Sequence, residues 1–559
     1  MKEYFKFAFR PHRLEVFVIL ILSIVQTYFQ LEIINLFKIA LRHVKLEEIA
    51  LLNADGQTMI IYSAILIISM MLVVYLANNL SVAITHETRE KLFHIESHLS
   101  PDEFNEFSST DLMNRVTGEP STEQTFIQIF LKNIIVIPFV TVGIVIELSL
   151  IDSEFALFLT IFIILLTMFI VYKLKQVTDV YFKVKKVNGR VSFLFREKIA
   201  GLKTIIVFKK RFFERKKFND AINVSYDTSL KFQLNQYYLP PLFILISDLF
   251  VLILLVYLFD FAIDPSITII NHSRYYNEFV DIVIIIQYML YFASVLLSLH
   301  SLIEIWPKAY SSSIRIEEIL ALEEKIIEND NKTLKSDFKG IEFRNVSFKR
   351  DEHEIINNVS FKIPSNTTAA IVGPYSSGKT VLMYLLDGVY KVDKGEILID
   401  GYDVNDLTSG ELKDKINFAL QKDFIFHDTV YNNLVLGDKS ITKNDVINAC
   451  DASGLSKLFN DELNLDTIIL ENASNISNGF KKKIMLTRSI VREKDIYIFD
   501  EHDYRVENKT NIILTKNIEE INDIEHIIVL DKGQIVGEGN HGELLKNCLT
   551  YKKLCGRGN

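Results

Sequence analysis

The chain contains 559 residues, of which 49% are hydrophobic and 23% charged, and its formal net charge is −9 at pH 7. A mean hydropathy of +0.20 excludes an ordinary soluble protein, and the length is sufficient for at least two domains. The apolar excess is confined to the N-terminal part, which predicts a membrane domain followed by a soluble domain.

Six stretches of the N-terminal part are predicted to span a membrane, because each is near the roughly 20 residues that a bilayer core requires. The alternative is a very large buried helical core, but residues 155–171 carry no charge, which is uncommon in a soluble helix. The first stretch lacks a small-residue cleavage site, so we expect an uncleaved span. With no domain before it, we do not expect a leader-cleaving protease. The six stretches are residues 15–37, 58–83, 131–151, 154–173, 238–262 and 278–304.

The loops between these stretches predict their orientation. Residues 173–237 hold sixteen Lys and Arg, whereas the turn at residues 151–153 has none, so the long basic loop should be cytoplasmic. An even number of spans then places the C-terminal domain in the cytoplasm as well. The basic run at residues 209–217 admits a nucleic-acid patch as an alternative, but beside a span it is more simply a positive-inside anchor, and we expect no nucleic-acid partner.

One carboxylate is predicted to lie inside the membrane. Asp248 falls near the middle of the fifth stretch, and such a group is costly unless it faces a cavity or a partner. It is therefore a candidate for a substrate pathway, with a hydrogen bond between helices as the alternative. The 40 Phe and 23 Tyr residues would suit an amphipathic or aromatic cargo, but they also serve as core and as interfacial belts.

The predicted domains are a membrane domain at residues 1–325, a charged linker at 326–339 and a soluble domain at 340–559. Pro307 is expected to close the sixth span, with helix continuing to about residue 320. All three cysteines, Cys450, Cys548 and Cys555, fall in the soluble domain without C-x-x-C or paired-His spacing, so we expect reduced cytosolic thiols.

The soluble domain contains a complete phosphate-binding pattern, G-x-x-x-x-G-K-[ST], at residues 373–380. The two glycines let backbone N–H groups turn toward phosphate, Lys379 can reach the β- and γ-phosphates, and Thr380 offers a hydroxyl to Mg²⁺. A chance match is the alternative, but an apolar strand at 368–373 and a helical stretch at 381–386 flank the pattern. We therefore expect ATP and Mg²⁺ as cofactors, held by Gly373, Pro374, Tyr375, Ser376, Ser377, Gly378, Lys379, Thr380 and Val381.

Further motifs follow in a fixed order, and together they closely resemble the nucleotide-binding domain of ATP-binding cassette (ABC) transporters. The segments that carry this resemblance are residues 341–348, 373–380, 421–430, 476–483, 495–501 and 527–545. Residues 104–117 and 188–208 resemble the cytoplasmic extensions of ABC exporters, which in that family carry coupling helices that dock on the cassettes. The resemblance implies an all-α six-helix membrane domain fused to an α/β P-loop cassette, which is half of an exporter.

The resemblance also implies roles for single residues. Asp500 would hold Mg²⁺, Glu501 would polarise the water that attacks the γ-phosphate, and Gln421 would contact Mg²⁺ and relay nucleotide state to the membrane domain. Arg350 falls where an aromatic residue normally stacks on adenine. Its guanidinium can stack there, and a solvated surface arginine is the alternative.

Three departures from the family pattern bear on activity. The signature Leu-Ser-Gly-Gly-Gln reads Ile-Ser-Asn-Gly-Phe at residues 476–480, so Ser477 and Gly479 match while Asn478 and Phe480 differ. Lys516 stands where the family has its switch histidine, and lysine donates hydrogen bonds but cannot accept one at neutral pH. The stretch between Glu501 and Lys516 is also about fifteen residues shorter than the family pattern, which implies a weak contribution to a partner's ATP site.

These features predict an ATPase coupled to transmembrane export, as one half of a dimer in the bacterial cell membrane. A heterodimer with one degenerate ATP site is favoured over a homodimer, and the cargo classes considered are peptide, lipid and amphipathic small molecule. The alternative function is a mainly structural or nucleotide-sensing subunit with little ATPase activity of its own. Import through the same architecture is a further alternative.

Overall fold

The protein is described by a computed structural model that forms two compact units, residues 1–326 and 327–559. It describes residues 2–556 except 100–103, 105, 106, 108, 239, 243, 247, 250, 251, 253–255, 257–271, 323–339, 351, 352, 421–423, 461, 462 and 503. The predicted linker at residues 326–339 and the metal-contacting candidate Gln421 therefore lie outside the described residues.

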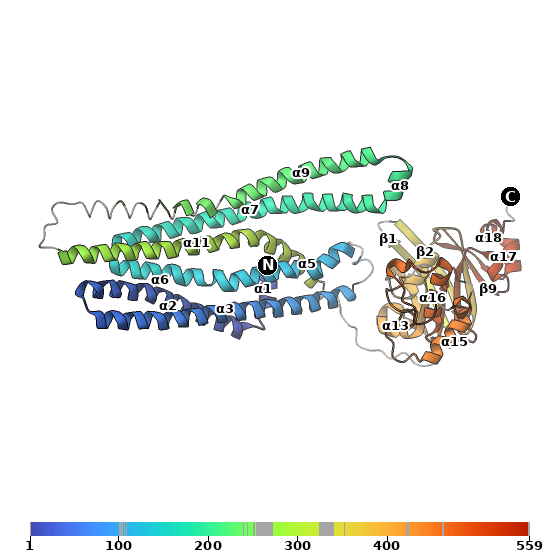
Figure 1. The fold of residues 1–559 in the computed structure, drawn as a ribbon. Coiled ribbons are helices and arrows are strands. Elements are labelled where there is room, and N and C mark those ends of the chain that lie inside the picture. The colour runs from blue at the N-terminus through green and yellow to red at the C-terminus, as the bar shows by residue number, and fades with distance from the viewer. Residues whose placement is uncertain are drawn as a thin grey trace. The chain divides into compact units, whose positions relative to one another are not determined.

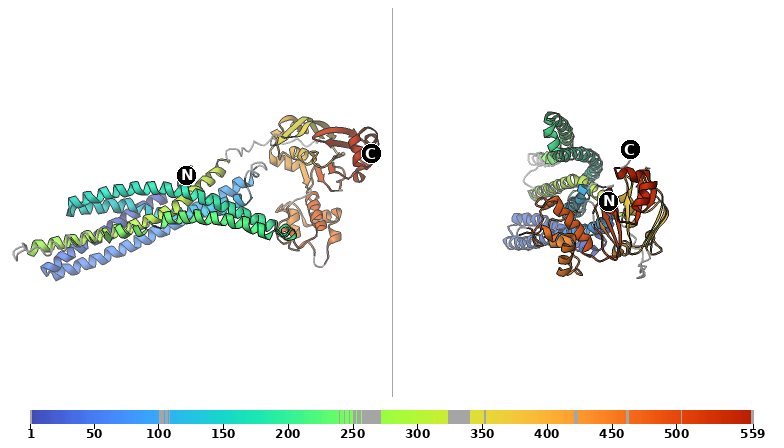
Figure 2. Two further views of the ribbon diagram at one scale, coloured as in Figure 1. Left: turned by 90° about the horizontal axis from the view of Figure 1, so that it is seen from above. Right: turned by 90° about the vertical axis from the view of Figure 1, so that its right-hand side faces the viewer.

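Where it is described, the first unit consists of helices joined by short turns, and its long helices lie side by side along one direction (Figures 1 and 2). Its helices are α1 (Lys2–Phe9), α2 (Arg13–Leu46), α3 (Ile49–Ser97), α5 (Ser109–Ile129), the π-helix η1 (Phe130–Ile134), α6 (Val136–Ile151), α7 (Ser153–Ala200), α8 (Leu202–Val207), α9 (Arg211–Tyr237) and α11 (His272–Leu320).

Five helical stretches in the described part are long and apolar enough to cross a membrane: 13–44, 49–97, 109–151, 153–200 and 279–320. They contain the first four predicted spans and nearly all of the sixth, whereas the fifth, 238–262, lies largely outside the described residues. Helix α3 alone has 49 residues, which at 1.5 Å per residue is about 73 Å, more than twice the thickness of a bilayer core. The helices therefore extend well beyond the membrane.

Helix α11 runs through Pro307 without interruption, although a proline removes one backbone hydrogen bond. Its neighbours explain why the helix continues, because Ile305 and Ala309 are buried in a shared core with α1, α3 and α5. Trp306 also contacts Phe126 of α5 edge to face, with 5.9 Å between the ring centroids. Packing on both sides of the proline thus carries the helix on to Leu320.

The second unit contains two sheets and the helices that cover them. One sheet has the order β2-β1-β4-β5 and the other the order β10-β9-β3-β8-β7-β6, in which β9, β3, β8, β7 and β6 are mutually parallel. The strands are β1 (Gly340–Arg350), β2 (His353–Pro364), β3 (Thr368–Val372), β4 (Lys394–Ile399), β5 (Tyr402–Asp403), β6 (Ile416–Ala419), β7 (Ile496–Asp500), β8 (Thr510–Thr515), β9 (His526–Asp531) and β10 (Gln534–Gly539).

Three hydrophobic cores hold this unit together. The largest fills the space between the two sheets and α12 (Lys379–Leu386), and a second covers the opposite face of the six-stranded sheet under α17 (His541–Asn547) and α18 (Leu549–Leu554). The third lies among α14 (Val430–Val435), α15 (Lys443–Ser453) and α16 (Asn478–Ile490). The short helix α13 (Ser409–Lys415) leads into β6.

The connection from β7 to β8 is unusually short. These parallel neighbours are joined by residues 501–509, and the described residues of that link contain no helix, whereas a parallel crossover ordinarily needs a dozen residues or more. Tyr504 and Val506 instead pack on the core of the sheet face. Asn511 fixes the link, because its Oδ1 accepts from Val506 N–H at 2.9 Å and its Nδ2 donates to Val506 O at 3.0 Å. The described residues of the short stretch noted in the sequence thus form a loop that Asn511 holds through Val506.

Candidate nucleotide-binding site

The phosphate loop connects β3 to α12, and its two glycines are required by close backbone approaches. A Cβ at Gly373 would lie 2.0 Å from Leu530 O. Gly378 has φ +100, in the left-handed region that favours glycine, and a Cβ there would lie 2.8 Å from Ile356 Cδ1. Both positions therefore demand glycine, and the loop leads directly into the N-terminus of α12.

Lys379 is folded back over its own loop. Its Nζ donates to Gly373 O at 2.9 Å, to Pro374 O at 3.0 Å and to Ser377 Oγ at 3.3 Å. Burial lowers the pKa of Lys379, while the charges of Glu501 and Asp500 act in the opposite direction. These carbonyl and hydroxyl contacts are ones that phosphate oxygens can replace, since an ammonium binds an anion more strongly than a neutral acceptor.

Thr380 and Asp500 meet at the point where β7 ends and α12 begins. Thr380 Oγ1 donates to Asp500 Oδ2 at 3.1 Å, and Asp500 is buried. Burial raises the pKa of Asp500, and the bond from Thr380 partly offsets this rise. A hydroxyl and a carboxylate beside a phosphate loop are donors that suit Mg²⁺, which usually takes only one or two protein ligands together with phosphates and water.

Glu501 follows Asp500 in a left-handed backbone conformation, with φ 56. Its N–H donates to Leu514 O of β8 at 2.9 Å, which fixes the backbone, and its carboxylate lies 3.8 Å from Lys516 Nζ. The two adjacent carboxylates therefore occupy different environments, with Asp500 against Thr380 and Glu501 facing Lys516.

Lys516 directly follows β8 and reaches the phosphate loop. Its Nζ lies 2.5 Å from the hydroxyl of Tyr375 and 4.6 Å from the centroid of the Tyr375 ring. The hydrogen bond with Tyr375, followed by the charge of Glu501, raises the pKa of Lys516. The sequence placed both residues at the site, but it gave no signal that they would touch, because they are separated by 141 positions.

Arg350 is the last residue of β1, and its guanidinium contacts an aromatic side chain. Its NH1 donates to Tyr390 OH at 3.0 Å, and its guanidinium carbon lies 5.4 Å from the centroid of the Tyr390 ring. Tyr390 in turn stacks on Phe348 of the same strand at 5.4 Å. This arrangement holds the guanidinium in a defined position, and its stacking on adenine stays a prediction.

The segment that departs from the family signature forms the start of α16. Ser477 caps this helix, because its Oγ accepts from Phe480 N–H at 3.2 Å. Ser477, Asn478 and Gly479 are exposed, whereas Phe480 is buried and contacts Phe459 with 6.2 Å between ring centroids. The position where the family has a glutamine thus faces the core of this helical region.

Sequence reasoning missed one residue beside the carboxylates. His502 is buried, and its Nε2 lies 3.2 Å from Leu420 O, next to the undescribed Gln421. Burial lowers the pKa of His502, which favours the neutral ring. Its position directly after Asp500 and Glu501 was the available signal.

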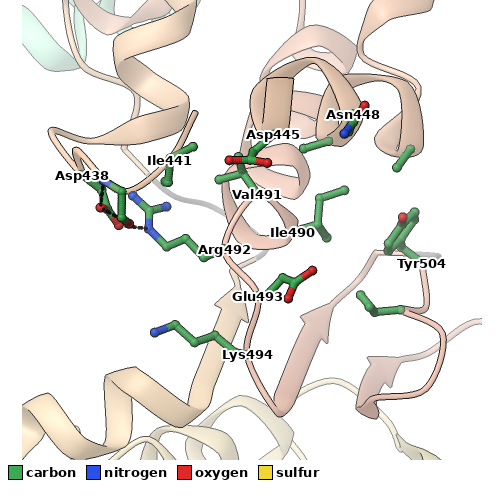
Figure 3. A pocket seen from close by; sticks show the side chains of 14 residues that line it. Asp438, Ile441, Asp445, Asn448, Ile490, Val491, Arg492, Glu493, Lys494 and Tyr504 are labelled. Carbon is green, nitrogen blue, oxygen red and sulfur yellow. Dashed lines mark hydrogen bonds and ion pairs between the residues drawn. The ribbon is translucent and has the colours of Figure 1, made fainter. Parts of the chain in front are cut away.

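A separate cavity of about 500 Å³ lies at the short crossover, between α15, the end of α16 and the β7–β8 link (Figure 3). Tyr504 and Val506 line one side, and Arg492 and Asp438 form an ion pair at 3.7 Å on another. None of the residues predicted for nucleotide binding lines this cavity, so it is distinct from the phosphate loop.

Comparisons with known proteins agree with the fold. Residues 16–271 match the family model of the ABC transporter transmembrane region, and residues 356–503 match that of the ABC transporter. The chain is 27% identical over 502 residues to the ABC transporter ATP-binding protein YfiB of Bacillus subtilis, covering 86% of this chain and 85% of the relative. It is 27% identical to the ATP-dependent lipid A-core flippase of Haemophilus influenzae over 66% of this chain and 64% of the relative. A bacterial Atm1-family ABC exporter with ATP bound shares the fold at a TM-score of 0.81, with 19% identity and 98% of each chain covered.

A bundle of long membrane-crossing helices joined to a P-loop domain defines a membrane transporter driven by ATP. The chain belongs to the ABC transporter family, as a half-transporter of the exporter type with one membrane region and one ATPase cassette. The predicted resemblance and fold class are confirmed, and the protein is a multi-pass membrane protein with a cytoplasmic cassette.

Proposed function

We propose that this chain is one half of a heterodimeric ATP-driven exporter in which one of the two ATP sites is degenerate. The observation that carries the proposal is the start of α16, where Asn478 is exposed and Phe480 is buried. In ABC dimers each ATP lies between one cassette's phosphate loop and the other's signature. A homodimer of this chain would place the altered signature at both sites, whereas a heterodimer confines it to one.

The chain's own residues are suited to the better of the two sites. Lys379 leaves the loop carbonyls for the β- and γ-phosphates, and Thr380 and Asp500, with Gln421, would hold Mg²⁺. When bound, Mg²⁺ neutralises charge on the phosphates. Glu501 would orient and polarise the attacking water, and a partner with an intact signature would complete this site.

Lys516 favours the second candidate, a nucleotide-sensing subunit with little turnover of its own. Its ammonium lies 3.8 Å from the Glu501 carboxylate, so the group expected to activate water is already engaged by a cation. In this alternative the chain holds ATP and a better-equipped partner hydrolyses it. The ATPase measurement below separates the two candidates.

For the cargo we propose a peptide, a lipid or an amphipathic small molecule. Relatives at 27–30% identity that are named as lipid A-core flippases support a lipid, whereas another relative is named as a β-(1→2)glucan export protein. Asp248 has an α-helical backbone and is exposed in the isolated chain. Its place on a cargo pathway is part of this proposal.

The test is to express the chain alone and together with a second half-transporter that has an intact signature, and to measure ATPase activity in lipid. We expect low activity for the chain alone and a large gain in the mixed complex. Robust cooperative hydrolysis by the chain alone, with no gain from the partner, would contradict the heterodimer. Binding without turnover in the mixed complex would favour the nucleotide-sensing alternative.

A further inference from the structure

One carboxyl group of α5 is completely buried and has no hydrogen-bond partner. Glu123 has none of its surface exposed. No donor among the described residues forms a hydrogen bond of normal geometry with either carboxylate oxygen, although the N–H of Ser313 on α11 faces it. A buried carboxylate without a partner carries a large desolvation cost, and such a group ordinarily avoids that cost by binding a proton. The packing therefore favours the protonated carboxylic acid at Glu123.

Glu123 lies in the part of α5 that extends beyond the membrane. The predicted third span begins at residue 131, about 12 Å further along the helix. Two buried residues that interact with Glu123 come from the corresponding ends of other helices, Tyr4 from α1 and Ser313 from α11. These positions precede the first predicted span and follow the sixth, so the group belongs to the cytoplasmic end of the bundle. Water and protons reach it from the cytoplasm if the helices separate.

A stripe of charged residues on α5 faces α11, and Glu123 is its last member. The stripe repeats every four residues, which places its members on one face of the helix: Asp111, Arg115, Glu119 and Glu123. Arg315 of α11 pairs with Asp111 and also, at 2.5 Å, with Glu119. Ser312 Oγ donates to the other oxygen of Glu119 at 2.5 Å. This contact, formed by residues 111–123 of α5 and 311–318 of α11, is the α5–α11 seam.

The groups around Glu123 do not supply it with a cation from the seam. Burial raises the pKa of Glu123 well above its usual range, and the charges of Glu119 and Glu317 add to the rise, while the charge of the N-terminal amino group acts against it. The other charged or titratable side chains of the packed helices have partners of their own: Arg315 (α11) and Lys185 (α7) bind Glu119, Arg89 (α3) binds Ser121, and the hydroxyl of Tyr4 (α1) bonds with Thr88.

We propose that Glu123 is a proton-binding site, which holds its proton while the α5–α11 seam is closed and releases it to the cytoplasm when the seam opens. Opening exposes the carboxyl group to water, which stabilises the anion. The O–H bond then breaks, the proton leaves to water, and the carboxylate remains on α5. The proposal goes beyond the proposed function, because it concerns the membrane domain and holds for a homodimer as for a heterodimer.

The direction of the pH dependence follows from the tighter binding of the proton in the closed seam. A hydrated glutamic acid has a pKa of about 4.3, and below this pH both states hold the proton, so the seam is fully stabilised. Between that value and the raised pKa of buried Glu123, the ratio of closed to open seams falls about tenfold for each pH unit. Rising cytoplasmic pH therefore loosens the seam.

The experiment measures hydrogen–deuterium exchange of the α5 and α11 backbone amides by mass spectrometry, with the purified full-length chain in nanodiscs. Wild type and Glu123→Gln are compared at the same pH, so that the intrinsic exchange rate cancels. Glutamine stays neutral at every pH. We therefore expect the variant to be better protected than wild type, by a factor that grows about tenfold per pH unit from pH 5 to pH 7.

Glu90→Gln, on an exposed glutamate of α3, is the matched control and should follow wild type at every pH. Glu119→Gln should lower protection throughout while keeping the pH dependence, because it removes a partner of Arg315. Glu123→Leu provides a second neutral variant if Glu123→Gln unfolds. Equal protection of wild type and the neutral variants at every pH would overturn the proposal. Lower protection of both neutral variants at every pH would also overturn it, since Glu123 would then hold the seam as an anion.

Discussion

At the scale of single residues, one side chain, that of Lys379, makes the contacts that hold the phosphate loop together. Lys379 Nζ is bound by two loop carbonyls and by Ser377 Oγ, so the loop is closed on itself by a cation. Nucleotide binding exchanges these neutral acceptors for phosphate oxygens, and the charged contacts are about twice as strong. Removing the ammonium therefore removes both the contacts that hold the loop together and the group that binds phosphate.

Lys379→Ala is therefore expected to abolish binding of Mg-ATP by the purified chain. Photolabelling with an ATP analogue provides the measurement, with Lys391→Ala on the exposed side of the turn after α12 as a control. Equal labelling of wild type and Lys379→Ala would show that the loop does not hold ATP through this lysine.

Asp387, which follows α12, predicts a pH dependence of stability. Burial raises the pKa of Asp387 from 3.8 to about 6, although the charge of Lys413 acts against the rise. The folded state thus retains this proton above the pH at which the unfolded chain loses it. The stabilisation is complete below about pH 4 and is lost as the pH rises through 6, with a total of roughly 3 kcal/mol.

We expect Asp387→Asn to be more stable than wild type at pH 8, by an amount that shrinks toward pH 4. Thermal unfolding of the full chain at both pH values measures this difference, and Asp414→Asn, on an exposed carboxylate of α13, is the matched control. A difference between Asp387→Asn and wild type that does not change with pH would argue against a buried, proton-retaining carboxyl.

At the scale of elements, the strands and the phosphate loop could be predicted because short motifs fix them. The glycines at 373 and 378 and the apolar runs on either side of the loop specify β3 and α12 locally. The bridge from Lys516 to Tyr375 could not be predicted, since it depends on the register of β8 between two other strands. Hydropathy predicted only the part of α3 or α7 that meets lipid, and it was the family resemblance that implied the long cytoplasmic extensions of these helices.

Helix α16 is another element for which the sequence alone was not sufficient, and its structure allows a prediction. From the sequence, Asn478 and Phe480 were equivalent departures from the signature, but the helix exposes the first and buries the second against Phe459. Restoring the family residue at 480 would place an amide in an apolar core, at a cost of about 3 kcal/mol or more. Restoring glycine at 478 costs at most about 1 kcal/mol of helix propensity.

We therefore expect Phe480→Gln to lower the unfolding temperature of the chain clearly, while Asn478→Gly leaves it within a few degrees. Differential scanning fluorimetry compares the two variants, and Phe480→Leu, which keeps the side chain apolar, serves as the control. If Phe480→Gln were as stable as Asn478→Gly, then Phe480 would not be a core residue of this region.

At the scale of the whole molecule, the chain is half of a transporter whose ATP sites are shared between two cassettes. Its phosphate loop, Asp500 and Glu501 retain the family chemistry, while its signature and its β7–β8 connection do not. In the proposed heterodimer, the retained residues would serve this chain's own nucleotide, and the altered ones would face the partner's nucleotide. The proposal therefore implies two unequal ATP sites.

The proposed asymmetry makes a prediction for the proposed heterodimer. Glu501→Gln in this chain should lower the ATPase rate of the complex by about a hundredfold, the loss typical when a general base is removed, while ATP binding stays intact. The corresponding substitution in the partner should change the rate by less than about twofold, because the partner's ATP would lie against the altered signature, where Asn478 is exposed. Glu519→Gln, on an exposed glutamate three residues after Lys516, is the control within this chain. If the partner's substitution alone stopped hydrolysis while Glu501→Gln kept near-normal turnover, this chain would be the nucleotide-sensing subunit and its partner the ATPase.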